Sequence, residues 1–481
     1  MVDDLFKMGA AELSKSIRNG ERSPQIVVEK TLDRINKRNK NINAFITICD
    51  ESARKDARRI ESAIENNEDV GSLAGVPVAI KDLTDVAGTS TTFGSVPLAN
   101  NIAKKNDIIV QRLKDAGAVV VGKTNTPEFG RKTITDNKLV GATKNPWRPS
   151  LIAGGSSGGS AAALADGQVP LAQGTDVGGS IRIPSAVCGT VGMIPDFGRV
   201  PLGNSRSDAF IHTQPFSYSG PMARNVEDIA LTLDVLSGPN SADPYSLPHR
   251  EGSYLDVIKN GVDNWSIAYS PDLGICRVDD SITEIIEKEI GEFEAIGANI
   301  KKESPEFETD HEELHNALLV LLRQRYLGLY EDVKSSYGID LLASDDVTEE
   351  VTSRIRKGKK LSPEEVRQAE RIRTKAYDTM RSFFSDYDLL VAPTIGCPPF
   401  KIDTSSPKIN NKKVDPNHGW VLTWPFNLTG NPAMSIPVGT VNRRPVGIQL
   451  VGQRLADIDV ICAGAAYERR NPWNNHFPYL N

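Results

Sequence analysis

Two serines set in glycine-rich frames constrain the fold of this chain more than any other feature. The first frame is Gly154–Ser160, which reads GGSSGGS, and the second is Gly174–Arg182, which reads GTDVGGSIR. Clustered glycines let a backbone turn tightly and approach a ligand closely. A serine hydroxyl among free backbone N–H groups is typical of a nucleophile beside an oxyanion hole. We therefore expect these turns to present Ser156 and Ser180 to a substrate.

A lysine upstream completes a candidate catalytic set. Lys81 ends the short apolar stretch Val76–Ile80, where a lysine is ordinarily solvated and charged. To act as a base it must be buried and neutral, because only an unprotonated amine accepts a proton. Desolvation lowers a lysine pKa by up to about 3–5 units. A Ser-Ser-Lys set would hydrolyse amides without histidine or metal, so we predict neither a metal nor a cofactor.

Two other motifs overlap the first frame. Residues 154–158 also fit G-x-S-x-G, the nucleophile elbow of α/β-hydrolases, but that elbow follows a strand. Here the preceding residues 145–150 read NPWRPS, which favours a loop. A phosphate-binding P-loop is excluded because Gly159 is followed by serine and alanine, not by lysine and a hydroxyl residue.

The order of the three motifs resembles the amidase signature family, over residues 73–224 and again over 424–452. The resemblance implies that Ser180 is the nucleophile, Ser156 a proton-relaying bridge and Lys81 the base. It also implies a cis peptide bond before Ser156. The stretch Gly122–Gly130, GKTNTPEFG, looks more like free-standing amidases, which usually have proline there.

The same resemblance assigns further residues around the triad. The oxyanion hole maps onto the backbone N–H groups of Val177, Gly178, Gly179 and Ser180. Asp176 and Arg182 are expected to brace this loop by a charge-assisted hydrogen bond. The acyl pocket maps onto the segment Thr135, Asp136 and Asn137, the loop with Phe210, His212 and Phe216, and the group Trp424, Phe426 and Asn427. Their aromatic content favours an apolar acyl group, and core packing explains it equally well.

Hydrophobic periodicity indicates an α/β protein. Helices are expected within 9–65 and over 108–116, 226–236 and 282–295, and strands over 76–80, 118–121, 265–269, 389–392, 434–438 and 448–451. This alternation predicts layers around a buried sheet. The resemblance further implies one α/β/α domain, residues 1–481, with a large mixed sheet. We divide the domain into an N-terminal helical segment (1–72), the signature core (73–271), a helical cover (272–388) and a C-terminal return to the sheet (389–481).

The cover segment carries no motif of the family. Ser362-Pro363-Glu364-Glu365 predicts a helix start, with a serine N-cap and glutamate at N3. The basic run 354–360 is interpreted as a solvated loop because aromatic residues do not alternate with the charges. The segment is expected either to wall the substrate channel or to form a solvated cover.

One stretch of the cover matches a metal motif. His311-Glu312-Glu313-Leu314-His315 fits H-E-x-x-H, which places both histidines on one helix face. A mononuclear zinc site needs a third protein ligand, and no partner motif follows. We interpret the stretch as a solvated polar face.

Composition limits the classes of partner that this chain is expected to bind. A net charge of −6 argues against nucleic acid binding. The five cysteines stand singly, without the spacing of a disulfide framework or zinc ribbon. Without a secretory signal or a long apolar run, we expect a cytoplasmic protein with no membrane contact. Its partner is a small-molecule amide, and a homodimer is compatible with the sequence.

The sequence thus predicts an amidase that converts a carboxylic acid amide to the acid and ammonia or an amine through a seryl acyl-enzyme. Two alternatives stay open. One is the glutaminase A subunit of a tRNA-dependent amidotransferase, and the other is a zinc peptidase that uses His311 and His315.

Overall fold

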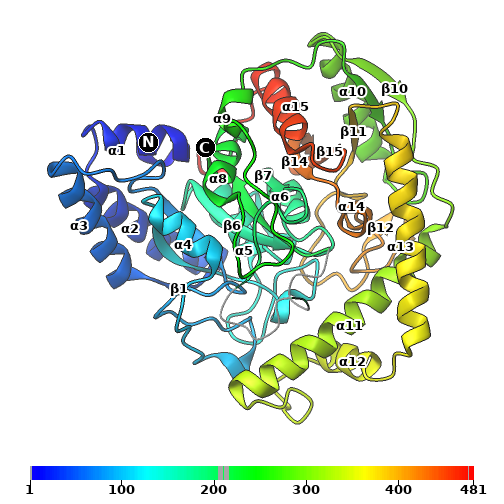
Figure 1. Cartoon of the computed structure of the whole chain (residues 1–481), viewed down its shortest axis with the longest axis horizontal. Helices are drawn as coiled ribbons and strands as arrows, with labels where there is room; N and C mark the ends of the chain where they lie inside the picture. The colour runs from blue at the N-terminus through cyan, green and yellow to red at the C-terminus, as the bar shows by residue number, and fades with distance from the viewer. Residues whose placement is uncertain (1–2, 204–209, 211–215, 475, 481) are drawn as a thin grey trace.

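A single large sheet organises the molecule. The computed structural model describes residues 3–203, 210, 216–474 and 476–480. Its main sheet has eleven strands, which cross the molecule from the N-terminal helices to the cover segment (Figure 1). In spatial order they are β1 (Phe45–Ile48), β3 (Val119–Thr124), β2 (Pro77–Lys81), β6 (Leu171–Asp176), β8 (Tyr218–Ala223), β7 (Val191–Ile194), β14 (Ala433–Val441), β15 (Arg444–Gly452), β11 (Leu389–Pro393), β9 (Ser266–Tyr269) and β10 (Asn299–Lys302).

The sheet is mixed, as predicted. Strand β2 lies parallel to both β3 and β6, and β9 lies parallel to both β10 and β11. The remaining neighbours are antiparallel. Strands β2 and β6 are therefore central neighbours that run in the same direction, and their carboxyl ends meet at one edge of the sheet. Lys81 ends β2 and Asp176 ends β6, which brings the first and third sequence motifs together.

Helices pack against this sheet in two groups. One group, α4 (Ile108–Asp115), α8 (Val226–Leu236), α15 (Asp457–Arg470) and α10 (Asp280–Ala295), forms a series in which each helix contacts the next. The other comprises α5 (Gly158–Ala165) and α6 (Arg182–Cys188), which contact each other and begin at the two glycine-rich turns. The N-terminal segment contributes α1 (Ala10–Arg18), α2 (Pro24–Ile42) and α3 (Asp50–Glu65).

The cover segment is mostly helical, with one difference from prediction. Helices α11 (His311–Tyr337), α12 (Glu349–Gly358) and α13 (Pro363–Phe383) lie together along one side of the molecule (Figure 1). Helix α13 begins at the predicted capping box of Ser362 and Glu365. However, the segment also contains β10, which extends the sheet at its edge. Within the described residues, no helix combines the length and the apolar character required to cross a membrane.

Candidate active site

Lys81 is a fully buried amine at the end of β2. Its side chain is 0% exposed, and its Nζ lies 2.7 Å from Ser156 Oγ. Nζ also donates to Thr175 Oγ1 (2.9 Å) and to the Thr175 carbonyl (3.3 Å). Burial lowers the pKa of Lys81 well below its ordinary value, and the Asp176 carboxylate opposes that shift in part. The structure thus supports the uncharged amine that a base requires.

A second buried lysine shows why Lys81 is unusual. Lys123, on the adjacent strand β3, is also 0% exposed, but its Nζ forms an ion pair with Asp82 at 2.9 Å. It also donates to Thr91 Oγ1 at 2.9 Å. Lys123 is therefore a paired cation, whereas the three recorded contacts of the Lys81 amine are all with uncharged oxygens.

Ser156 lies on the turn that leads into α5. Its side chain is buried, and the peptide bond between Gly155 and Ser156 is cis, as the resemblance implied. The next residue links both glycine-rich turns, because the Ser157 amide donates to the Ser180 carbonyl at 3.1 Å. The Ser157 hydroxyl donates to the Thr175 carbonyl at 3.2 Å. These bonds hold Ser156 between the lysine and the second turn.

Ser180 lies on the loop between β6 and α6, which Asp176 braces from beneath. Asp176 Oδ1 accepts from the Gly179 amide at 2.6 Å, and Oδ2 accepts from the Ile181 amide at 3.0 Å. Burial would raise the pKa of Asp176, but the Arg182 charge and hydrogen bonds from Arg182, Asn427 and Ile181 outweigh it and lower that pKa. The predicted brace between Asp176 and Arg182 is present as a fully buried ion pair at 3.2 Å.

Arg182 extends this brace to the C-terminal part of the chain. Its Nη1 donates to the Thr423 carbonyl and to Gln449 Oε1, both at 3.0 Å. Its Nη2 donates to Asn427 Oδ1 at 2.6 Å, and Asn427 Nδ2 in turn donates to Asp176 Oδ1 at 2.8 Å. Asn427 was predicted to face the acyl pocket; it instead supports the loop that carries Ser180.

The loop needs glycine at one position and offers fewer free amides than predicted. Gly179 has φ of +121°, and a Cβ there would lie 1.9 Å from Thr423 Oγ1. Because the Gly179 amide donates to Asp176, it is not available to an oxyanion. Among the described residues, the amides of Gly178 and Ser180 have no recorded acceptor.

Ser156 and Ser180 line one cavity with a cationic wall. Its polar lining includes Arg131, Lys132, Arg325, Arg354 and His418. An adjoining cavity shares Leu83, Phe129, Thr175, Val177, Arg325 and Tyr326 with it and adds the apolar residues Phe93, Ile109, Leu202 and Leu329. We call the first the catalytic chamber and the second the apolar chamber. Helices α11 and α12 contribute to the catalytic chamber, so the cover segment does contact this site.

Some of the predicted pocket residues lie near the two turns, but they do not line the chambers. Within the described parts of the chain, neither chamber is lined by Thr135, Asp136, Phe210, Phe216, Trp424 or Phe426. Thr135 accepts a hydrogen bond from the Gly158 amide at 3.1 Å, and Asp136 pairs with Lys132. Phe210 is 66% exposed, whereas Phe216, Trp424 and Phe426 are buried. His212 lies outside the described residues.

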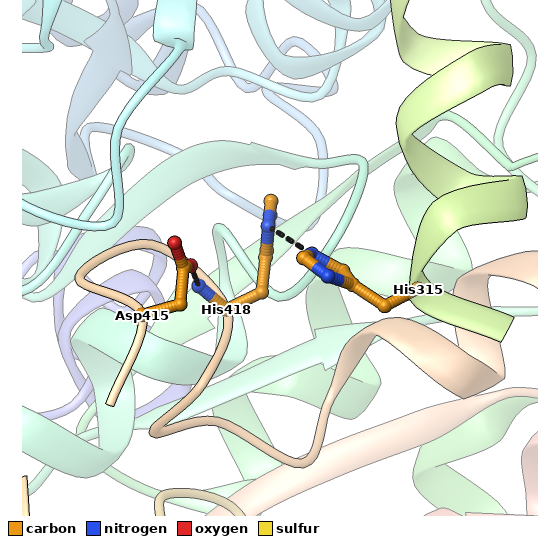
Figure 2. A group of neighbouring side chains, drawn as sticks. All are labelled: His315, Asp415 and His418. Atoms are coloured by element: carbon orange, nitrogen blue, oxygen red, sulfur yellow. Dashed lines mark hydrogen bonds between the residues drawn. The ribbon is translucent and has the colours of Figure 1, made fainter. Parts of the chain in front are cut away.

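The histidines of the cover segment do not form a solvated face, contrary to prediction. His311 and His315 do share one side of α11, but both rings pack against Trp424. His315 Nε2 lies 3.0 Å from Nδ1 of His418 (Figure 2). His418 also lines the catalytic chamber. Burial lowers the pKa of His315 to about 4, and it lowers the pKa of His418 well below its usual value.

The comparison with known proteins now identifies the family. The Amidase family profile matches residues 26–461. The chain belongs to the amidase signature family. It is 36% identical to an acylamidase of Rhodococcus erythropolis, with 99% of this chain and 98% of that protein aligned. It is also 32% identical to the A subunit of the glutamyl-tRNA(Gln) amidotransferase of Carboxydothermus hydrogenoformans, with 99% and 100% aligned.

Solved structures of the amidase signature family share the whole architecture. A bacterial aryl acylamidase superposes with a TM-score of 0.94 at 33% identity, with full coverage of both chains. The 6-aminohexanoate cyclic dimer hydrolase superposes with a TM-score of 0.89 at 28% identity, again with full coverage. The protein is thus a hydrolytic amidase of this family.

Some site residues of this amidase escaped the sequence interpretation. Thr175 stands inside the second frame, next to Asp176, and contacts the lysine amine, yet no role was assigned to it. The basic run 354–360 was predicted to be a solvated loop; its other basic residues are exposed, but the run begins within α12 and Arg354 lines the catalytic chamber. His418 lies in no motif, and only its position in the fold reveals it.

Proposed function

We propose that this amidase forms a seryl acyl-enzyme, with Ser180 as nucleophile, Ser156 as proton relay and Lys81 as base. The observation that carries the proposal is the buried Lys81 amine, 2.7 Å from Ser156 Oγ, in a site whose two serines line one chamber. A buried lysine without a carboxylate partner is costly for a fold unless it is neutral, and a neutral amine can take a proton.

The contacts of Lys81 favour proton transfer from the Ser156 hydroxyl to the lysine amine. A neutral amine has two N–H donors and one lone pair. Thr175 offers two acceptors, its carbonyl and its hydroxyl, at 3.3 and 2.9 Å. When both N–H groups point to Thr175, the lone pair is left for the hydroxyl proton of Ser156.

The proposed reaction then balances in two halves. Ser180 Oγ bonds to the amide carbon and its proton passes to Ser156, while the proton of Ser156 passes to Lys81. Collapse of the tetrahedral intermediate breaks the C–N bond, and Lys81 returns a proton to the leaving amine through Ser156. Water oxygen then bonds to the acyl carbon while its proton passes through Ser156 to Lys81. The C–O bond to Ser180 breaks, the acid is released, and the proton returns through Ser156 to Ser180 Oγ. The amides of Val177, Gly178 and Ser180 are the proposed oxyanion donors, and the Gly179 amide holds the loop.

The chambers suggest which substrates fit. The apolar chamber opens from residues that also line the catalytic chamber, so one arm of the scissile amide can be apolar and is proposed to be the acyl group. Burial of each added methylene contributes about 0.8 kcal/mol. The acylamidase and aryl acylamidase relatives agree with a substrate of this type.

A substrate panel tests this proposal. Purified protein is assayed with anilides and primary amides whose acyl chain lengthens stepwise, with acid and amine release as readouts. We expect kcat/KM to rise with acyl length, by about fourfold per methylene. Ser180→Ala should retain the fold and lose amide turnover by several orders of magnitude. A folded Ser180→Ala that keeps more than a few percent of activity would contradict the assignment of the nucleophile.

A second candidate is a glutaminase of the amidotransferase type. The catalytic chamber is lined by Arg131, Arg325 and Arg354, which can pair with the α-carboxylate of glutamine. Relatives of that class align over nearly the whole chain. Ammonia release from L-glutamine that exceeds release from the panel of neutral amides would favour this function.

The zinc peptidase alternative has weaker support. The motif requires Glu312 as a general base beside the metal. Glu312 is exposed and lines a surface groove with Asn316 and Ser362 that shares no described residue with the catalytic chamber.

A further inference from the structure

A cluster of three potential metal ligands lies beside the catalytic chamber and has no part in the proposed reaction. His315 projects from α11, and Asp415 and His418 lie on the loop that precedes α14 (Trp424–Thr429). One ligand atom of each lies within 4.8 Å of the other two. Figure 2 shows the two imidazoles facing each other, with Asp415 on the side of His418 away from His315.

We propose that His315, His418 and Asp415 bind a divalent transition-metal ion such as Zn²⁺, and that this ion inhibits the enzyme by fixing a wall of the catalytic chamber. The site is distinct from the H-E-x-x-H motif, because it uses only the second histidine of that motif. It gathers ligands from segments that are 103 residues apart in sequence.

The nitrogen atoms are already near the spacing that zinc requires. Zn–N bonds of about 2.0–2.1 Å at a tetrahedral angle place two ligand nitrogens about 3.3 Å apart. Nε2 of His315 and Nδ1 of His418 are 3.0 Å apart, so a small separation of the rings, with a turn that points both lone pairs at one spot, would admit the ion. One ligand atom of each residue lies within 4.8 Å of the other two, so a modest side-chain adjustment would bring Asp415 to the ion.

Asp415 can supply the third ligand without loss of its present role. Its Oδ1 accepts from the amides of Asn417 (3.0 Å) and His418 (2.7 Å), and it thereby holds the loop that carries His418. Among the described residues, its second oxygen has no recorded partner. The side chain is exposed, so water can complete a four-coordinate site.

Ligand chemistry favours a transition metal over calcium or magnesium. Two imidazoles suit Zn²⁺, Cu²⁺ or Ni²⁺, whereas Ca²⁺ and Mg²⁺ take oxygen ligands. Binding also conserves protons. In the free pair one ring donates its N–H to the lone pair of the other, and metal binding requires both lone pairs. The shared proton therefore moves to the other nitrogen of its own ring, and no proton leaves the site.

The site is coupled to the chamber through the His418 ring. A Cβ placed on Gly178 would lie 3.7 Å from Nε2 of His418, so this edge of the ring faces the nucleophile loop. A metal on Nδ1 of His418 would clamp the ring to α11 and would add positive charge beside a chamber already lined by arginines. We therefore expect lower turnover, by about tenfold at saturation, which is within the usual range of coupling between two sites. The expected inhibition rests on the proposed hydrolysis at Ser180, whereas the proposed metal binding does not depend on it.

The test separates binding from inhibition. Chelator-treated full-length protein is titrated with Zn²⁺ against a chromophoric chelator, and its anilide hydrolysis is followed over the same Zn²⁺ range. His315→Ala and His418→Ala should each weaken binding by about 100-fold or more, and Asp415→Asn by about tenfold. The exposed His476→Ala serves as the matched control and should bind as the wild type does. If His315→Ala or His418→Ala fails to fold, Asp415→Asn still tests the metal site.

Each experimental result tests a separate part of the proposal. Wild-type affinity in His315→Ala and Asp415→Asn would overturn the site, as would an affinity lost in His311→Ala but retained in His315→Ala. Zinc binding that leaves hydrolysis unchanged would overturn the coupling to the chamber. A complete lack of hydrolysis without metal would contradict the proposed function and leave the binding result intact.

Discussion

The most demanding prediction concerns Arg182→Met, because Arg182 and Asp176 form the buried ion pair that supports the loop carrying Ser180. This substitution keeps much of the side-chain volume and removes the charge. The guanidinium donates to Asp176, Thr423, Asn427 and Gln449, and both members of the ion pair are 0% exposed. The variant therefore leaves the Asp176 carboxylate buried without its cation.

The size of the effect follows from that burial. Removal of one partner of a buried ion pair costs about 3–5 kcal/mol, because the remaining charge stays desolvated. A chain of 481 residues unfolds with an entropy of about 1 kcal/mol/K. The expected fall in Tm is thus only about 3–5 °C, although the change in free energy is large.

The deficit should depend on pH with a definite sign. In the wild type the pKa of Asp176 is lowered, so its contribution to stability is present above the unfolded value of about 3.9 and is lost as pH falls through the folded pKa. In the variant, burial is no longer outweighed and the pKa of Asp176 should rise above that unfolded value. Its contribution is then present at low pH and is lost as pH rises. The difference between variant and wild type should be larger at pH 8 than at pH 5.

Thermal and urea unfolding at both pH values, with anilide hydrolysis alongside, measure these effects. The matched control is Arg356→Met, because Arg356 pairs with Glu349 at the surface, where the side chains are 53% and 76% exposed. Such surface pairs contribute about 0–1 kcal/mol. If Arg182→Met lies within about 1 kcal/mol of the wild type at pH 8, or is destabilised equally at both pH values, the electrostatic reasoning fails.

Four further predictions concern the lysines and metal removal. Lys81→Ala should lose about 10³-fold or more in amide turnover and less for an ester with the same acyl group, because only the amine needs the returned proton; an equal or larger loss on the ester would refute this role. In the wild type, activity should rise with pH through the lowered pKa of Lys81, and a pH–rate profile without an acid limb would count against the neutral-amine base. Lys123→Met should lower the free energy of unfolding by about 3 kcal/mol because it leaves Asp82 buried without its cation, and an unchanged urea midpoint would argue against that pairing. Prolonged chelation should not reduce amide hydrolysis, and its loss on zinc removal with recovery on zinc addition would favour the peptidase alternative.

Sequence reasoning reached the elements that carry strong local signals. The strand ending at Lys81 was predicted, and helix α8 (Val226–Leu236) has the predicted bounds, because apolar periodicity and caps are local properties. Strand β6 was missed, although it carries Thr175. Its sequence LAQGTD contains two small residues and one amide, and its central place between β2 and β8 is a property of the tertiary fold.

The candidate site likewise contains residues that a local motif reveals and residues that only tertiary packing reveals. Lys81, Ser156 and Ser180 lie in motifs, so the sequence was sufficient to name them as candidates, and the structure places Lys81 beside Ser156. The lining of the chambers comes from side chains on α11 and α12 that tertiary packing brings to the second turn. Arg354 illustrates this limit, because a basic run has the same local pattern whether one face of its helix meets solvent or a cavity.

The long reach of Arg182 also fixes when the enzyme can become active during synthesis. The partners that hold its guanidinium, Thr423, Asn427 and Gln449, follow it by 241, 245 and 267 residues. At about 5–20 residues per second, a ribosome needs roughly 10–50 s to deliver them after the nucleophile turn has emerged. A nascent chain that ends before Thr423 carries Lys81, Ser156 and Ser180, the three proposed catalytic residues, but lacks the groups that set the loop. Activity should therefore report that synthesis has passed residue 449, and two separately expressed fragments divided between Arg182 and Thr423 should regain it only when they associate.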